Sequence, residues 1–165
     1  NTSSAFVALP GNLSVDENLM FFARLYGVTK PKARIAELLE MFEVAHLRRS
    51  ITGRLSSGES ARVNLCKALL NDPGLIFFDE PTASLDPDMA DKFRKHLRAL
   101  QNLRAITKLY TSHNMRDVEE VCDRILFLQH GRILTSGSSQ EILEKFGKET
   151  LEEVFIQVAR EDHRP

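Results

Sequence analysis

The spacing of apolar residues predicts three amphipathic helices in the first part of this chain of 165 residues. The first follows Ser14 and ends at Gly27, the second covers residues 30–42, and the third covers residues 58–71. Ser14 and Glu17 have the spacing of a capping box. Apolar residues recur at the three- to four-residue interval of one helix face. The expected buried positions are Val15, Leu19, Phe22, Leu25, Ile35, Leu38, Leu39, Phe42, Val63, Cys66, Leu69 and Leu70.

After Pro73 and Gly74 the pattern changes to an alternation of strands and helices. Strands are expected over 75–79 and 106–110, and two more over 124–128 and 132–135 around a turn at His130-Gly131. The expected helices are 87–100, 116–122, 138–146 and 151–158. This alternation is typical of an α/β fold with a parallel sheet. We therefore expect a helical subdomain over 1–72, an α/β part over 73–147, and a C-terminal helix and tail over 148–165.

The segment from Leu75 to Pro81 carries the strongest chemical signal. Four apolar residues predict a buried strand, and Asp79 and Glu80 stand at its C-terminal end, where α/β folds bind ligands. A carboxylate there can hold Mg²⁺ through water, and a second can polarise an attacking water. Taken alone, the segment is equally compatible with a buried strand that ends in an acidic turn.

Three flanking motifs favour the chemical interpretation. Leu55-Ser56-Ser57-Gly58-Glu59 precedes the strand, Ser84-Leu85-Asp86 follows it, and Thr111-Ser112-His113 closes the next apolar run. In order and spacing they resemble the signature loop, D-loop and H-loop of the ATP-binding-cassette (ABC) ATPases, with Asp79-Glu80 as the Walker B acids. The resemblance extends from about Leu13 to Ile156. It implies a partial P-loop NTPase (RecA-like) core with the all-helical signature subdomain of the family.

The resemblance also implies a role for each motif residue, with ATP and Mg²⁺ as cofactors. Asp79 would hold Mg²⁺ through water, Glu80 would polarise the attacking water, and His113 would contact the γ-phosphate. Asp86 would cross the interface between two nucleotide-binding domains, or cap the following helix, or do both.

In the family the signature loop binds the γ-phosphate of ATP held by the other subunit. Its residues here are Ser56, Ser57, Gly58 and Glu59. The commonest form of the loop has glycine at the position of Ser57 and glutamine at that of Glu59. Glu59 therefore places a negative charge near a phosphate, and weaker nucleotide-driven closure is expected. Arg62 in the following helix could pair with acids near the Walker B loop or remain in solvent.

No stretch of the chain reads G-x-x-x-x-G-K-[ST], the sequence whose amides and lysine cradle phosphates. The family's Q-loop glutamine is expected just before Asn1. We therefore expect an N-terminally truncated nucleotide-binding domain, inactive by itself. Loss of the P-loop strand would leave a gap between strands 75–79 and 106–111 and the hairpin. Unpaired strand edges favour pairing with another chain, so oligomerisation or a rearranged sheet is expected.

Composition narrows the classes of partner. Hydrophobic residues make up 42%, charged residues 27%, and the net charge is -1, so no bulk attraction to nucleic acid is expected. Cys66 and Cys122 lack metal-ligand spacing and are expected to be reduced. No segment approaches the roughly 20 apolar residues of a membrane span. The expected location is peripheral, at the cytoplasmic face of the membrane.

Two segments resemble exporters of the drug and polysaccharide (ABC-2) group: Phe21 to Gly27, and the ending Leu151-Glu152-Glu153-Val154-Phe155. The segment between Ser14 and Leu55 is too short for the coiled coil of DNA-repair ABC ATPases. The favoured function is the ATPase subunit of an exporter, working with a transmembrane permease and a second nucleotide-binding domain. The alternative is a soluble ABC ATPase that acts on a ribosome or nucleic acid.

Overall fold

The computed structural model describes residues 2–4, 9–103 and 106–161. The chain divides into two compact units, Asn1–Thr111 and Ser112–Pro165. The limit between these units, after Thr111, differs from the subdomain limits at residues 72 and 147 that the motifs predict. The limits at 72 and 147 remain a prediction about subdomains. Asn1, next to which the Q-loop was expected, lies outside the described residues.

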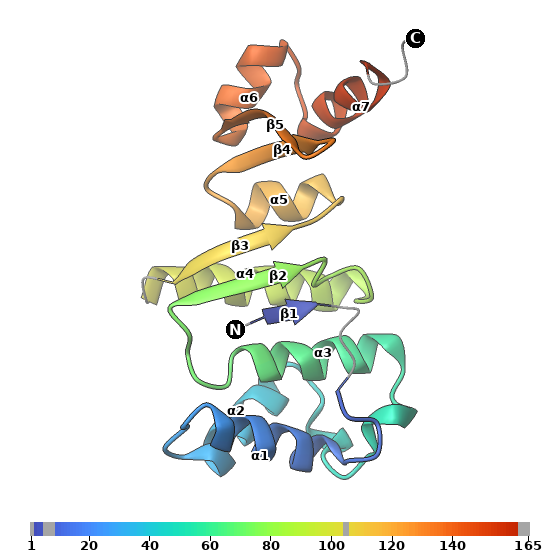
Figure 1. Ribbon diagram of the computed structural model, residues 1–165, viewed down its shortest axis with the longest axis vertical. Coiled ribbons are helices and arrows are strands. Elements are labelled where there is room, and N and C mark those ends of the chain that lie inside the picture. The colour runs from blue at the N-terminus through green and yellow to red at the C-terminus, as the bar shows by residue number, and fades with distance from the viewer. Residues whose placement is uncertain (1, 5–8, 104–105, 162–165) are drawn as a thin grey trace. The chain divides into compact units, whose positions relative to one another are not determined.

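The first unit contains a parallel sheet with the order β1-β2-β3 (Figure 1). Its strands are β1 (Thr2–Ser4), β2 (Leu75–Asp79) and β3 (Thr107–Thr111). The register pairs Asp79 with Thr111 on one side and with Ser4 on the other. Strand β1 was not predicted, because three hydroxyl residues carry no apolar pattern, and residues 1–72 are therefore not purely helical. Long-range pairing with β2 makes this segment a strand.

The prediction that β2 is a buried strand is confirmed for one of its two faces only. Burial alternates along the strand: Ile76 and Phe78 are buried, whereas Leu75 is 45% and Phe77 42% exposed. Successive side chains of a strand point to opposite faces of the sheet. Leu109 of β3 is 50% exposed. Within the described part of the first unit, one face of the sheet is therefore largely uncovered.

Four α-helices complete the first unit: α1 (Val15–Leu25), α2 (Pro31–Met41), α3 (Ser57–Ala68) and α4 (Pro87–Leu103). Short 3₁₀ turns at Ala45–Leu47 and Thr52–Arg54 connect α2 to α3. In Figure 1, α1, α2 and α3 pack side by side. The rings of Phe42, Phe78 and Phe93 join the helices to the sheet, with centroids of Phe78 and Phe93 5.6 Å apart.

The capping box predicted for α1 is confirmed, since Ser14 and Glu17 exchange both hydrogen bonds. All but two of the expected buried positions in the three helices are buried. Leu25 is the clear error, with 64% of its surface exposed. Phe22 is half-buried, with the ammonium group of Lys67 4.9 Å from its ring centroid. Ala23 lies on the buried side of α1 instead.

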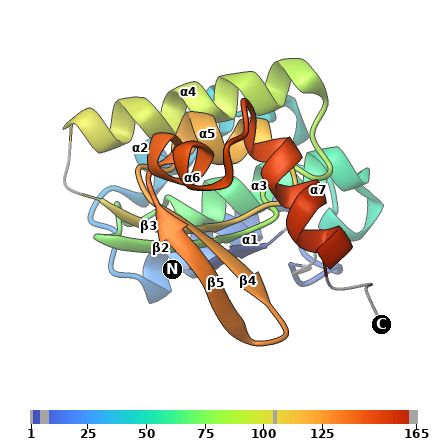
Figure 2. The same cartoon turned by 90° about the horizontal axis from the view of Figure 1, so that it is seen from above.

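The second unit consists of α5 (Met115–Val121), β4 (Ile125–Gln129), β5 (Arg132–Gly137), α6 (Ser139–Phe146) and α7 (Leu151–Glu161). Strands β4 and β5 form the predicted antiparallel hairpin (Figure 2). His130 and Gly131 at its tip have φ of 46° and 73°, as the tight hairpin turn that favours the right-handed strand twist requires. The apolar core of the second unit contains the buried side chains of Ile142, Leu151 and Val154.

The described strands lie in two separate sheets, one in each unit. The gap expected between strands 75–79 and 106–111 and the hairpin 124–135 remains a prediction. Whether the chain oligomerises through its strand edges remains a prediction. No helix in the described ranges is long and apolar enough to cross a membrane.

Candidate functional site

Asp79 and Glu80 lie where β2 ends, beside the end of β3. The chain turns sharply at Glu80, which has a φ of 46°, a left-handed conformation that non-glycine residues adopt at a cost. The turn directs the Glu80 amide to β3, where it donates to the Thr111 carbonyl over 3.1 Å. The Thr111 hydroxyl donates to Asp79 Oδ1 over 2.8 Å. The strand end therefore presents two adjacent acidic residues, of which Asp79 is exposed and Glu80 is half-buried. Their hydrogen bonds to Thr111 fix the Asp79 carboxylate and the Glu80 backbone.

This donor set suits Mg²⁺ bound together with a nucleotide. The described ranges contain no group of three or more His, Cys, Asp or Glu side chains that could hold a metal ion. Mg²⁺ is typically held by one or two carboxylates, several waters and substrate phosphates, without an all-protein cage. Asp79 offers such a carboxylate at the strand end.

The signature-loop sequence leads directly into α3, and Ser56 is the N-cap residue of that helix. Ser56 and Glu59 form a capping box: the Ser56 hydroxyl accepts from the Glu59 amide, and Glu59 Oε2 accepts from the Ser56 amide over 2.8 Å. The hydrogen bond from the Ser56 amide, then that from its hydroxyl, holds the pKa of Glu59 below its ordinary value. The helix start therefore already carries a carboxylate. Ser57 and Gly58 are the first two residues of α3, where amides have no acceptor within the helix and can face an anion.

The structure brings the signature loop and the D-loop together. A Cβ atom on Gly58 would lie 3.0 Å from the carbonyl oxygen of Ser84. Asp86, at the other end of the D-loop, caps α4 by accepting from the Met89 amide over 3.0 Å. This hydrogen bond lowers the pKa of Asp86. The capping role that was one alternative for Asp86 is thus confirmed, and its role across an interface remains a prediction.

Arg62 was expected either to pair with acids near the Walker B loop or to remain in solvent. Its guanidinium donates to the carbonyl of Phe42 over 3.5 Å, and the side chain is half-buried. It does lie close enough to Glu59 and Asp86 to contribute to the lowered pKa of both carboxyls.

His113 belongs to the second unit and follows β3 by two residues. Its side chain is exposed. The next residue, Asn114, starts α5 by accepting a hydrogen bond from the Arg116 amide. The role of His113 at the γ-phosphate remains a prediction.

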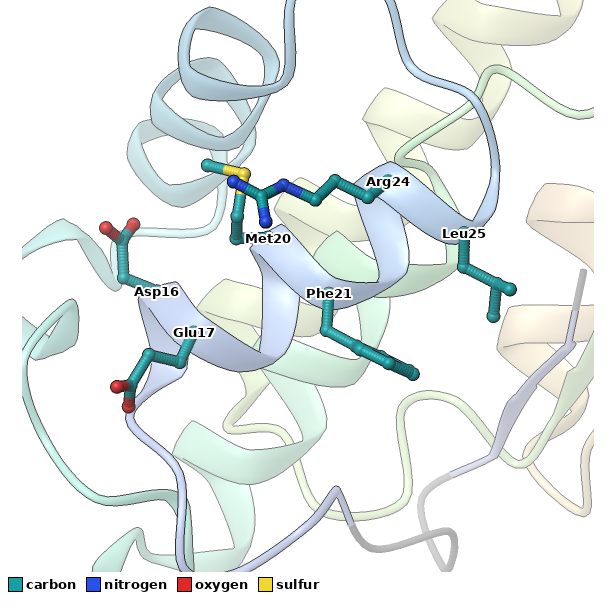
Figure 3. A pocket seen from close by; sticks show the side chains of 6 residues that line it. All are labelled: Asp16, Glu17, Met20, Phe21, Arg24 and Leu25. Carbon is teal, nitrogen blue, oxygen red and sulfur yellow. The ribbon is translucent and has the colours of Figure 1, made fainter.

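Sequence reasoning missed two features of the first unit. One is the contact of Thr111 with Asp79 and Glu80, since the motif Thr111-Ser112-His113 was noted only for His113. The other is an open groove of about 650 Å³ along the outer side of α1. Phe21 and Leu25, which are 57% and 64% exposed, point to the same side of the helix in Figure 3. Arg24 extends toward Met20 on the other side of the helix, and Asp16 and Glu17 lie at its opposite end.

Comparison with solved structures defines the fold class. The chain matches "Structure of ATP binding subunit of ABC transporter" with a TM-score of 0.83 at 24% identity, covering 96% of this chain and 68% of the other. It matches a dimeric ATP-binding cassette in a post-hydrolysis state, bound to ADP and Pi, with a TM-score of 0.75 at 23% identity. That match covers 84% of this chain and 62% of the other. The fold is therefore that of the P-loop NTPase domain of such subunits.

Sequence comparison identifies the family. The ABC transporter family model matches residues 2–83. The linearmycin resistance ATP-binding protein LnrL of Bacillus subtilis (strain 168) is 32% identical over 91% of this chain and 49% of its own length. The Nod factor export ATP-binding protein I of Rhizobium sp. (strain N33) is 37% identical over 85% of this chain and 46% of its own length. The chain belongs to the ABC transporter family.

The chain spans only part of these relatives. It covers about half of LnrL, and 59% of the ABC transporter ATP-binding protein NatA of Bacillus subtilis (strain 168), to which it is 32% identical.

Proposed function

We propose that this chain is part of the ATP-hydrolysing subunit of an ABC exporter that powers transport through a membrane partner. The observation that carries the proposal is the adjacent pair Asp79 and Glu80 at the carboxyl end of β2, fixed against the end of β3. In this family context, Asp79 would hold Mg²⁺, and Glu80 would polarise the water that attacks the γ-phosphate. Hydrolysis of ATP depends mainly on such positioning and charge neutralisation. Bound Mg²⁺ supplies charge neutralisation at the phosphates.

The remaining motif residues complete a site shared between two subunits. The amides of Ser57 and Gly58, at the start of α3, bind the γ-phosphate held by the opposite nucleotide-binding domain. Asp86 faces that domain from the D-loop, and His113 contacts the γ-phosphate in its own subunit. The dimeric neighbour bound to ADP and Pi supports this arrangement.

The groove on α1 is the surface that we assign to the transmembrane partner. Two large apolar side chains, Phe21 and Leu25, are exposed there one helical turn apart. Large exposed apolar side chains rimmed by charges mark interaction sites. Transport out of the cell is supported by relatives named for Nod factor export and linearmycin resistance. The location that follows is peripheral, at the cytoplasmic face of the membrane.

The experiment that tests the catalytic assignment is ATP turnover by the full-length subunit with and without Glu80→Gln. We expect the variant to bind ATP and to lose turnover by at least about 100-fold. The 165 residues alone contain no P-loop sequence and are expected to show negligible turnover. Full activity of Glu80→Gln would refute the assignment of the base.

The docking surface has its own test. Replacement of Phe21 and Leu25 by serine should lower the amount of the subunit that sediments with membranes from the source cells, without loss of ATP binding. Leu128→Ser is the matched control, because Leu128 is 70% exposed and lies on β4, outside the groove. Equal loss in the control would show that general surface polarity, and not the groove, causes the effect.

A further inference from the structure

The hydroxyl of Thr111 bridges the two Walker B acids. Asp79 and Thr111 are register partners at the ends of β2 and β3. Thr111 Oγ1 donates to Asp79 Oδ1 over 2.8 Å and accepts from the Glu80 amide over 3.3 Å. A threonine hydroxyl has one proton to donate and lone pairs to accept with. The group therefore fulfils both roles at once.

The main-chain carbonyl of Thr111 strengthens the same link. It accepts from the Glu80 amide over 3.1 Å, so this amide is shared between the carbonyl and the hydroxyl of one residue. These contacts hold the turn at Glu80, whose φ is 46°. A residue in such a conformation persists where its surroundings over-determine it. One residue of β3 thus fixes the carboxylate of Asp79 and the backbone of Glu80.

We propose that Thr111 is a positioning residue for ATP hydrolysis, acting through its hydroxyl on the carboxylate of Asp79 and on the backbone of Glu80. This inference rests on the proposed function. A hydrogen bond to Oδ1 restricts the Asp79 carboxylate to one orientation. Partners of this kind orient metal ligands, and their loss typically costs about 10- to 100-fold in metal affinity or activity.

The test uses the full-length subunit with three single variants, which are Thr111→Val, Thr111→Ser and Glu80→Gln. Thr111→Val removes the hydroxyl and keeps the size and β-branching, while Thr111→Ser keeps the hydroxyl. Thr111 is exposed at a strand end, so neither variant should impair folding, and a thermal melt checks this. We expect Thr111→Val to lower kcat by about 10-fold or more with little change in KM for ATP. Thr111→Ser should stay close to wild type.

A second measurement does not depend on turnover. In a Glu80→Gln background with ATP bound, Mn²⁺ replaces Mg²⁺ and its affinity is read by electron paramagnetic resonance. We expect Thr111→Val to weaken Mn²⁺ binding by about 10-fold, and Thr111→Ser to leave it nearly unchanged. Unchanged kcat or Mn²⁺ affinity in Thr111→Val would overturn the proposal, as would equal defects in both Thr111 variants.

The Glu80→Gln variant separates the two levels of inference. If it keeps full turnover, the proposed function of the Asp79–Glu80 pair fails, whatever the Thr111 variants show. If it loses turnover while Thr111→Val does not, only the role of Thr111 fails.

Discussion

Gly58 of the signature loop lies so close to Ser84 of the D-loop that a methyl group on Gly58 would come within 3.0 Å of the Ser84 carbonyl oxygen. This approach is tighter than an ordinary van der Waals contact, and the neighbour is main chain, which yields less easily than a flexible side chain. The two loops are separate in the sequence, and they can lie this close because residue 58 is a glycine and has no side chain.

Gly58→Ala should displace the D-loop relative to the start of α3. Since a shift of about 1 Å at a catalytic assembly can cost about 100-fold, we expect ATP turnover of the full-length subunit to fall by at least about tenfold. Ser57→Ala is the control, because Ser57 is exposed on the same loop and alanine keeps the main-chain amide that we assign to the phosphate. A Gly58→Ala variant with normal turnover would show that the D-loop adjusts without consequence.

Glu59→Gln should strengthen ATP-driven association of two subunits. Glutamine can retain the capping-box hydrogen bonds that Glu59 makes with Ser56, and it removes a negative charge beside the amides that we assign to a phosphate. We expect dimerisation at severalfold lower ATP concentration, measured by light scattering in the non-hydrolysing Glu80→Gln background. Glu17→Gln changes an equivalent capping box on α1 and should have no such effect.

Three capping boxes should make the stability of the protein sensitive to acid. Hydrogen bonds from Ser14, Ser56 and Ser138 hold the pKa of Glu17, Glu59 and Glu141 below the ordinary value of 4.5. The folded-state pKa is thus below the unfolded one. The stabilisation is therefore present above about pH 4.5 and is lost as the pH falls through the folded-state pKa.

Thermal melts between about pH 6 and pH 3 check this expectation. Replacing the three glutamates by glutamine should flatten the loss of melting temperature at the acid end. Glu152→Gln, an exposed position outside the boxes, should leave that loss as it is. An unchanged acid profile in the triple variant would contradict the contribution of the capping boxes.

Phe93→Ala should destabilise the first unit strongly. Phe93 of α4 is 1% exposed and contacts the rings of Phe78, at a centroid distance of 5.6 Å, and Phe42, at 6.2 Å. Removing a buried phenyl ring typically costs about 3–5 kcal/mol. Denaturant unfolding measures the change. Phe21→Ala, at a position that is 57% exposed, should change the free energy of unfolding by only about 0.5 kcal/mol.

The sequence was sufficient for features that depend on local patterns. A capping box located the start of α1, and the helical period identified buried residues such as Leu38 and Cys66. The sequence was insufficient for features that depend on contacts between residues distant in the sequence. β1 exists through its pairing with β2, and the outward exposure of Leu75 and Phe77 depends on which side of the sheet the helices cover.

The same distinction applies to the candidate site. The acids of β2 and the signature loop could be predicted because their residues are contiguous. The contribution of Thr111 could not, because it depends on the register between two strands. The groove on α1 was missed for the opposite reason: helical periodicity predicted Leu25 to be buried, and it is exposed beside Phe21.

The left-handed backbone of Glu80 has a consequence for saturation mutagenesis at this position. Asparagine and glycine adopt a φ near 46° readily, whereas valine, isoleucine and threonine do so at a steric cost. The activity of each replacement at position 80 therefore depends on two properties: whether the new residue tolerates this main-chain conformation, and whether its side chain can polarise water. Glu80→Asn reports the loss of the carboxylate alone, while Glu80→Val would also disturb the turn in which the Ala83 amide donates to the Glu80 carbonyl over 3.2 Å.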